Sequence, residues 1–574
     1  MNLSWLARLG DWNPQLFREL KGRLKPRNLT IAVAISLVGQ LLLLISFAGQ
    51  LPVDELRGSI YNKYCTSSNG SNPSQECLRD AAGSFVINWQ LWSLDVFTWL
   101  SLIGIFAMLV VGTYMLISDL SREEHRGTLN FIRLSPQSTQ SILTGKLLGV
   151  PILLYIVAAL ALPLHLWLGL AAQIPLSLIL SFYGVLAASC LFFYSVSLLY
   201  GLLSAGLGGF QAWLGSGAVL MFLFAMTSMT SSSNIVTHTP ADWVMLFSPS
   251  LALPYLVASS SLPSSILNFF NANDLERLRF FYLPVGASAW SAAGFMLLNY
   301  GLWTYWTWQG LKRCFHNRST TIFSKQQSYL LTACFEVAIL GYALQSRRGL
   351  PETGSGLFEN FAFLLVFNLL LFVFLIAALS PHRQALQDWA RYRHQKRSSR
   401  KWGLIRDLLW DEKSPALVAV VMNLAITATI LTPWVLLWPG SEYKAAALLG
   451  LLLSVNLILI YACVAQLMLF MKMQKRVLWA ASTVGGLIIL PPVIFGLLSI
   501  QPNEMPVLWL FSAFGWAAAK DATTTTVFLA VLGQWLTLTL LAARFTRQLR
   551  RAGESVSKAL FAGRPSLPSA SKQL

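Results

Sequence analysis

Runs of about 20 apolar residues recur along the whole chain, separated by short polar or charged segments. A run of this length crosses the hydrocarbon core of a bilayer as one α-helix. The runs predict twelve spanning helices, near 30–52, 95–117, 148–172, 176–203, 207–229, 286–310, 329–345, 358–379, 416–438, 445–471, 477–500 and 523–543. The pattern therefore predicts an all-α polytopic membrane protein, because lipid admits only helices and closed barrels and these runs have helical length.

One further apolar segment, 507–519, is shorter than the others. Pro506 precedes it, and Lys520 and Asp521 follow it. We interpret it as a re-entrant or interfacial piece on the outer side of the membrane, and a thirteenth span is the alternative interpretation.

Composition agrees with this class of protein. Hydrophobic residues make up 55% of the 574 residues and charged residues only 11%. A soluble domain carries about 25% charged residues. The sequence leaves no stretch for a large soluble domain between the apolar runs.

The basic residues predict the orientation of the chain. With both termini assigned to the cytoplasm, 33 of the 42 lysines and arginines fall in inner segments and nine in outer ones. Such a bias towards the inner side is the usual topology signal, and it agrees with an even number of spans. The net charge of +18 is thus explained by segments that face anionic lipid, and it does not indicate a nucleic-acid partner.

The first 29 residues are expected to form a cytoplasmic amphipathic helix at the membrane surface. Leu16, Phe17, Leu20 and Leu24 share one helical face, with basic residues around them. A solvated basic leader is the alternative. A cleaved signal peptide is not expected, because the first long apolar run begins only near Thr30.

Two of the six cysteines, Cys65 and Cys77, share the outer loop 53–94. Topology places this loop on the oxidising face, so a disulfide between them is plausible. The other four cysteines lie in or beside spans, where small apolar packing is the ordinary role of a cysteine.

No catalytic motif is visible in the sequence. Gly145 and Lys146 do not complete a phosphate-binding loop, because Gln140 stands at the position of the first glycine and Leu147 at that of the Ser or Thr. Neither a metal-binding spacing of His or Cys nor a nucleophile motif is present. The chain is therefore not expected to be an enzyme by itself, to bind a metal or to carry a cofactor.

Two ionisable residues lie within predicted spans, His165 in 148–172 and Glu336 in 329–345. Such groups are functional candidates because they are costly in lipid. Glu336 could carry protons, which keeps an ion-coupled secondary transporter as an alternative function, or it could be a protonated group hydrogen-bonded to a neighbouring helix. For His165, a packing histidine with satisfied hydrogen bonds is the favoured interpretation.

The inner segment 118–147 differs from an ordinary connection, because it has about thirty residues where a few would suffice. Gly127 and Thr128 can start a helix, with Thr as a capping residue, and Pro136 can end it. The sequence predicts a short helix of mixed charge here, suited to dock in a groove of a partner.

This segment resembles the one between the second and third spans of type-2 exporter permeases, the membrane subunits of ATP-binding-cassette transporters. The family pattern is roughly E-[KR]-E-x-G-T-x-E-x-L, then Pro, Ser or Thr two residues later, and Gly-Lys nine and ten residues after the Pro. Matching positions are Glu123, Gly127, Thr128, Pro136, Ser138, Gly145 and Lys146. His125 and Asn130 replace two of the usual acids, although Glu124 is adjacent to His125.

The resemblance covers residues 12–312, including an outer segment 230–285 with Phe-Ser-Pro at 247–249 that is similar to short outer helices of the family. It implies a six-helix permease unit over 30–312 in a plasma (inner) membrane. It also implies a partner ATPase subunit that binds ATP and Mg, with Glu123, Glu124 and Arg126 near the docking surface.

The second half of the chain carries weaker signals. We expect two further spans in 313–379, a basic cytoplasmic linker over 380–415, a degenerate second permease-like unit over 416–545 and a basic, disordered tail over 546–574. The loop that would match 118–147 is reduced to six residues at 471–476. One chain then offers one full docking site, so a second permease chain, identical or different, is expected in the working exporter.

Overall fold

The computed structural model describes residues 10–52, 62–66, 77–81, 84–204, 209–231, 235–262, 272–317, 320–345, 354–395, 401–439 and 442–553. Every regular element in these ranges is a helix, and only isolated β-bridges accompany them. The prediction of an all-α architecture is confirmed.

Ten helices of the described chain are long and apolar enough to cross a membrane. One of them is the continuous run of α4 (Trp89–Phe106), η1 (Ala107–Val111) and α5 (Gly112–His125). The other nine are α3 (Pro26–Ala48), α8 (Ile152–Ala171), α9 (Leu176–Leu203), α10 (Phe210–Thr230), α16 (Gly354–Leu379), α19 (Leu417–Leu436), α20 (Glu442–Leu469), α21 (Arg476–Leu497) and α23 (Thr524–Gly553). The chain is thus a multi-pass membrane protein.

The two remaining predicted spans, 286–310 and 329–345, are also helical but do not reach the same apolar character. They correspond to α14 (Ala289–His316) and α15 (Lys325–Ala343). Both Lys325 and Glu336 lie on α15, and both side chains are buried. All twelve predicted runs are therefore helices, and ten of them meet the length and composition of a span.

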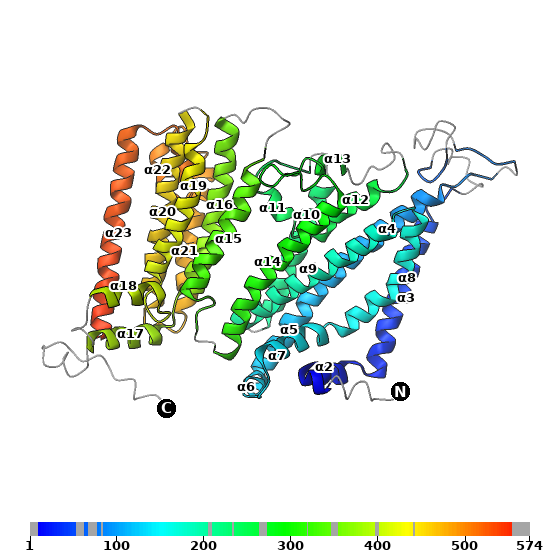
Figure 1. Cartoon of the computed structure of the whole chain (residues 1–574), viewed down its shortest axis with the longest axis horizontal. Helices are drawn as coiled ribbons and strands as arrows, with labels where there is room; N and C mark the ends of the chain where they lie inside the picture. The colour runs from blue at the N-terminus through cyan, green and yellow to red at the C-terminus, as the bar shows by residue number, and fades with distance from the viewer. Residues whose placement is uncertain are drawn as a thin grey trace. The chain divides into compact units, whose positions relative to one another are not determined.

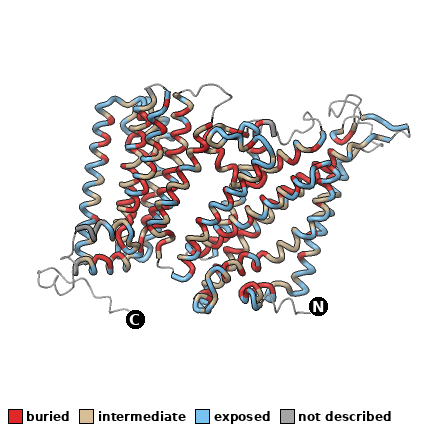
Figure 2. The backbone as a smooth tube through the Cα atoms, in the orientation of Figure 1, coloured by how far each residue is buried: buried red, intermediate tan, exposed pale blue. Residues whose placement is uncertain are grey.

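The chain divides into two compact units, Met1–His316 and Asn317–Leu574. In the first unit, α9 packs along α5 and α14, and α8 packs along α3 and α4 (Figure 1). Helix α3 is mostly exposed along its length (Figure 2), with 17% of its apolar window buried. An apolar helix exposed in this way has lipid as its natural surroundings.

The outer segment 230–285 of the first unit contains several short helices among its described residues. They are α11 (Asp242–Met245), η3 (Pro249–Ala252), α12 (Leu253–Ala258) and α13 (Ala272–Leu275). Short helices, which the family resemblance implied for this segment, are present among its described residues.

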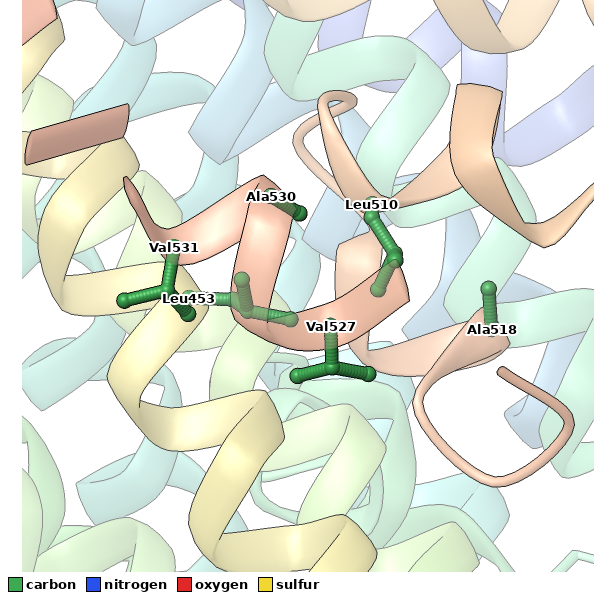
Figure 3. Packing of buried hydrophobic residues seen from close by; sticks show 6 residues of the cluster. All are labelled: Leu453, Leu510, Ala518, Val527, Ala530 and Val531. Carbon is green, nitrogen blue, oxygen red and sulfur yellow. The ribbon is translucent and has the colours of Figure 1, made fainter. Parts of the chain in front are cut away.

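The second unit contains α15, α16 and the helices from α17 to α23. The apolar segment 507–519 forms α22 (Pro506–Leu510) and the turn η4 (Gly515–Ala518), which are far too short to span. Leu510 and Ala518 of this segment pack in one hydrophobic cluster with Leu453, Val527 and Val531 (Figure 3). The segment is thus a packed cap on α20 and α23.

Two helices, α17 (Arg383–Gln395) and α18 (Lys401–Trp410), form within the basic linker 380–415. They lie across one end of the upright helices of the second unit (Figure 1). Helix α23 continues to Gly553, so the expected disordered tail is wrong for 546–553, because Arg550 and Arg551 in its last turn favour the helix C-terminus. Residues 554–574 lie outside the described residues.

Candidate functional site

The inner segment 118–147 is a sequence of three helices separated by two sharp breaks. The first break is Gly127, whose φ of +71° is left-handed, a conformation that side chains other than glycine adopt at a cost. Helix α5 ends at His125 and α6 (Thr128–Arg133) begins after this glycine. The predicted start of a short helix at Gly127 and Thr128 is confirmed.

The hydroxyl of Thr128 has a different role from the one expected. The sequence predicted that Thr128 caps the helix that it starts, but its Oγ1 donates to the carbonyl oxygen of Glu123 at 3.1 Å. It therefore satisfies a free carbonyl in the last turn of α5. The prediction was wrong because Gly127 takes the N-cap position of α6.

The second break contains Pro136. Helix α6 ends at Arg133, as expected of a helix that approaches a proline. Ser138 then begins α7 (Thr139–Gly149), and its hydroxyl accepts a hydrogen bond from the Ser141 amide at 3.2 Å. Ser138 is thus an N-cap residue.

Two large apolar side chains, one on α6 and one directly after it, are exposed. Leu129 and Ile132 are buried, whereas Phe131 is 80% exposed and Leu134 is 84% exposed. The helix lies at the end of the first unit where α2 (Pro14–Arg23) also lies (Figure 1). The exposure of Phe131 and Leu134 could not be predicted from the sequence, because no pattern in so short a helix shows which apolar residues face inward.

The fully buried Lys146 lies at the centre of an ion cluster. Its side chain is 0% exposed, and its Nζ donates to Asp119 Oδ2 at 2.8 Å. Glu123 Oε2 lies 2.6 Å from the same Nζ, and Glu19 Oε1 lies 3.8 Å from it. The cluster joins α7 to the last turns of α5 and to the amphipathic helix α2.

Two arginines of α2 complete the cluster. Arg18 pairs with Glu123 at 2.5 Å, and Arg23 pairs with Asp119 at 2.5 Å and with Glu19 at 3.2 Å. Three carboxylates are thus matched by three cations, which is the condition under which buried charge is tolerated.

The charge of Lys146 is stabilised by its neighbours. Burial alone would lower the pKa of its ammonium, but the carboxylates of Asp119, Glu123 and Glu19 outweigh burial and raise this pKa above its ordinary value. The three carboxylates lie close enough together to hold a metal ion. The Lys146 ammonium lies among them and supplies the positive charge instead.

Gly145 allows α2 to approach α7 closely. A Cβ at this position would lie 2.8 Å from both Asn13 Oδ1 and the backbone nitrogen of Leu16. Asn13 caps α2 by accepting from the Leu16 amide at 3.0 Å and donates to the Ser141 carbonyl at 2.8 Å. Leu16 and Leu20 are buried on this side of α2, so part of the predicted apolar face packs on protein.

We expect Gly145→Val to displace α2 from α7, because the new side chain would collide with backbone atoms. Overpacking of this kind costs about 1–3 kcal/mol of stability. The purified variant should unfold at a lower temperature than the wild type in a thermal scan. Gly22→Val is the matched control, because a Cβ at Gly22 meets nothing within 4 Å, and it should change the midpoint much less.

The two other charged residues of the predicted docking surface lie beside this cluster. Arg126 is exposed at the end of α5, next to the start of α6, and Glu124 is half-buried. Glu123 itself faces Lys146 and Arg18. Glu123 and Arg126 therefore differ in role: Glu123 forms ion pairs between helices, whereas Arg126 is exposed and accessible to a partner.

Glu336 is fully buried between three helices of the second unit. Its Oε1 accepts from Thr427 Oγ1 of α19 at 2.7 Å, and its Oε2 accepts from Asn368 Nδ2 of α16 at 3.3 Å. Further polar side chains, Ser328, Thr332 and Asn423, form hydrogen bonds along the same seam. The geometry agrees with the hypothesis of a carboxyl group hydrogen-bonded to neighbouring helices.

His165 is a packed histidine whose two ring nitrogens both have partners. Its Nε2 lies 2.7 Å from Ser101 Oγ and its Nδ1 lies 2.8 Å from the Tyr183 hydroxyl. The ring lies beside Phe97 and Phe182. These contacts leave no ring nitrogen for a ligand and match the favoured interpretation.

Cys65 and Cys77 form a disulfide, with their Cα atoms 5.2 Å apart. The disulfide expected between these two cysteines is confirmed. The bond lies on the loop between α3 and α4, so it restrains that loop and does not touch the ion cluster.

Comparison of the chain with models of known protein families, with curated proteins and with solved structures finds no match.

Proposed function

We propose that this chain is the membrane-spanning permease subunit of an ATP-binding-cassette exporter in the plasma membrane. ATP would be hydrolysed on a separate ATPase subunit, and this chain would couple that hydrolysis to movement of substrate. The observation that carries the proposal is a pair of exposed apolar side chains, Phe131 on α6 and Leu134 directly after it. The ion pair of buried Lys146 with Asp119 holds together the two helices on either side, α7 and α5. Clustered exposed apolar residues rimmed by polar ones are typical of docking sites.

The connections of α6 suit it to transmit force. It follows α5 after the single break at Gly127, and α5 continues through η1 into α4 as one helical run of 37 residues. The ion cluster also ties α5 and α7 to α2, and α2 ends two residues before α3 begins. A displacement of α6 would therefore act on α4, α8 and α3 together, through packed helices with fixed contacts.

The chemistry of Lys146 also agrees with a coupling role. A phosphate-binding lysine needs an accessible ammonium beside backbone amides of a glycine-rich loop. Lys146 instead is fully buried among three carboxylates. Nucleotide and Mg would accordingly be held by the partner ATPase subunit.

A second permease chain is part of the proposal. In the second unit, α20 ends at Leu469 and α21 begins at Arg476, which leaves only a short turn. This turn has no counterpart of α6, so each chain would provide one docking helix. Two chains would serve the two ATPase subunits, as a homodimer or a heterodimer.

The proposal is tested by purifying the chain from its native membrane under mild detergent and identifying the proteins that remain bound. We expect an ATPase subunit in a one-to-one ratio, and ATP-dependent transport only when both are reconstituted. Transport by the chain alone, driven by an ion gradient, would contradict the proposal.

Full burial of Glu336 favours a second candidate function, an ion-coupled secondary transporter. The variant Glu336→Gln distinguishes the two, because glutamine keeps the size of the side chain but carries no proton. In an ATP-driven exporter, Glu336 would only form hydrogen bonds with neighbouring helices, so the variant should keep transport within about two-fold of the wild type. A proton-coupled carrier would lose transport altogether, and an assay at fixed ATP with and without a proton gradient reports which occurs.

A further inference from the structure

The second unit contains a cavity of about 330 Å³ between α16, α20 and α21, next to the start of α17. This volume falls in the range of small-molecule sites. Most of its wall is apolar, with Ile376, Leu469, Val484 and Ile488 among the lining residues. The cavity plays no part in the coupling site described above, which lies wholly in the first unit.

The apolar part of the cavity is accessible from the surface of the helix bundle. Val373, Ala377 and Ala481 line it and are exposed. Helix α21 has only 11% of its apolar window buried, and side chains such as Leu478 and Leu490 are more than half exposed. Because an apolar surface of this kind faces lipid, the cavity opens towards acyl chains.

The other end of the cavity is basic. His382, Arg383 and Arg476 line it, and none of its described lining residues is acidic. The Nε of Arg383 is buried and has no hydrogen-bond partner. Within the described part of the chain, neither Arg383 nor Arg476 takes part in an ion pair.

The positive charge of Arg476 acts on Arg383. Burial and the positive charge of Arg476 lower the pKa of Arg383 from its ordinary value. Two cations that line one cavity, one of them with a buried donor that has no hydrogen-bond partner, favour an anion in that cavity. Arginine forms bidentate hydrogen bonds with phosphate, so a phosphate is the best match for this pair.

We infer that this cavity binds one anionic phospholipid of the cytoplasmic leaflet, with its phosphate between Arg383 and Arg476 and an acyl chain along α21. The combination of an apolar channel with a basic end at the membrane surface selects an amphiphile over a free anion or a neutral lipid. Both arginines belong to segments that the distribution of basic residues assigns to the cytoplasm. The inference is independent of the proposed exporter function.

Native mass spectrometry of the purified full-length chain tests the inference. The probes are phosphatidylglycerol and phosphatidylcholine with identical acyl chains, each added in detergent. The wild type should retain one phosphatidylglycerol per chain and several-fold less phosphatidylcholine. The double variant Arg383→Gln and Arg476→Gln should lower retention of phosphatidylglycerol at least five-fold.

A matched control and a second variant make the test decisive. Arg544→Gln with Arg547→Gln removes two exposed arginines near the end of α23 and should leave retention unchanged. Ala481→Trp fills the cavity but keeps both arginines, so it should also abolish retention of phosphatidylglycerol. This variant tests the inference independently if the double arginine variant does not fold. Equal retention of both lipids, displacement of lipid by inorganic phosphate, or unchanged retention in Ala481→Trp would overturn the inference.

Discussion

Replacement of Lys146 by methionine should destabilise the first unit and abolish transport. Methionine has a similar length but no charge, so Asp119, Glu123 and Glu19 would face only Arg18 and Arg23. Removing one partner of a buried ion pair costs about 3–5 kcal/mol, because it leaves uncompensated charge in a poorly solvated place. A thermal unfolding scan of the purified variant measures the loss, and reconstituted transport measures its consequence.

The control for this variant is Lys312→Met. Lys312 is exposed on α14, in a segment that is also assigned to the cytoplasm, so its loss should change the unfolding midpoint by little. A rescue variant sharpens the test further. Adding Glu123→Gln to Lys146→Met removes the excess negative charge, and it should restore part of the lost stability. No recovery in this double variant would show that the charge balance of the cluster is not what stabilises the site.

The pH dependence follows from the sign of the shift. The pKa of Lys146 is raised above its ordinary value of 10.5, so its stabilising contribution is fully present below that pH and is lost only as the pH rises through the folded pKa. Wild-type stability from this group should therefore be constant between about pH 6 and 9.

Replacement of Phe131 and Leu134 by serine should uncouple the chain from its ATPase while leaving the fold intact. Both side chains are more than three-quarters exposed, so their removal costs little folding energy. At a docking interface, however, a buried aromatic anchor contributes about 2 kcal/mol or more. Co-purification of the ATPase should fall at least ten-fold, and transport should fall with it.

The matched control for this pair lies in the second unit. Met471→Ser with Met473→Ser changes two exposed apolar residues in the short turn between α20 and α21. The turn has no docking helix, so the control should keep both ATPase binding and transport. Retained ATPase binding in the Phe131 and Leu134 variant, or an equal loss in the control, would remove α6 as the docking element.

The positions of the long apolar helices could be predicted because hydropathy is a local property. Each apolar run is long enough to cross lipid, and within lipid its backbone can satisfy its hydrogen bonds only as a helix. The interval 176–203 therefore coincides with α9 to the residue. The less apolar α14 and α15 show the limit of this reasoning, because packing against other helices stabilises them as well.

The helix breaks within 118–147 could be located for a similar reason. Glycine, proline and serine act on the backbone within a few residues of themselves, so the breaks at Gly127 and Pro136 could be read directly. The spacing of Gly145 and Lys146 was also visible. Their roles were not, since both depend on α2, which lies more than 120 residues away along the chain.

What the sequence determined by itself is thus the class of protein, the position of its apolar helices and the breaks at Gly127 and Pro136. What only the tertiary structure decided is which side chains meet: Lys146 with Glu19, Asp119 and Glu123, and Glu336 with Thr427 and Asn368. It also brings Arg383 and Arg476 to the lining of one cavity. The physical reason is that hydropathy and turn chemistry act over a few neighbouring residues. Ion pairs, buried hydrogen bonds and cavities depend instead on contacts between helices that are distant in the chain.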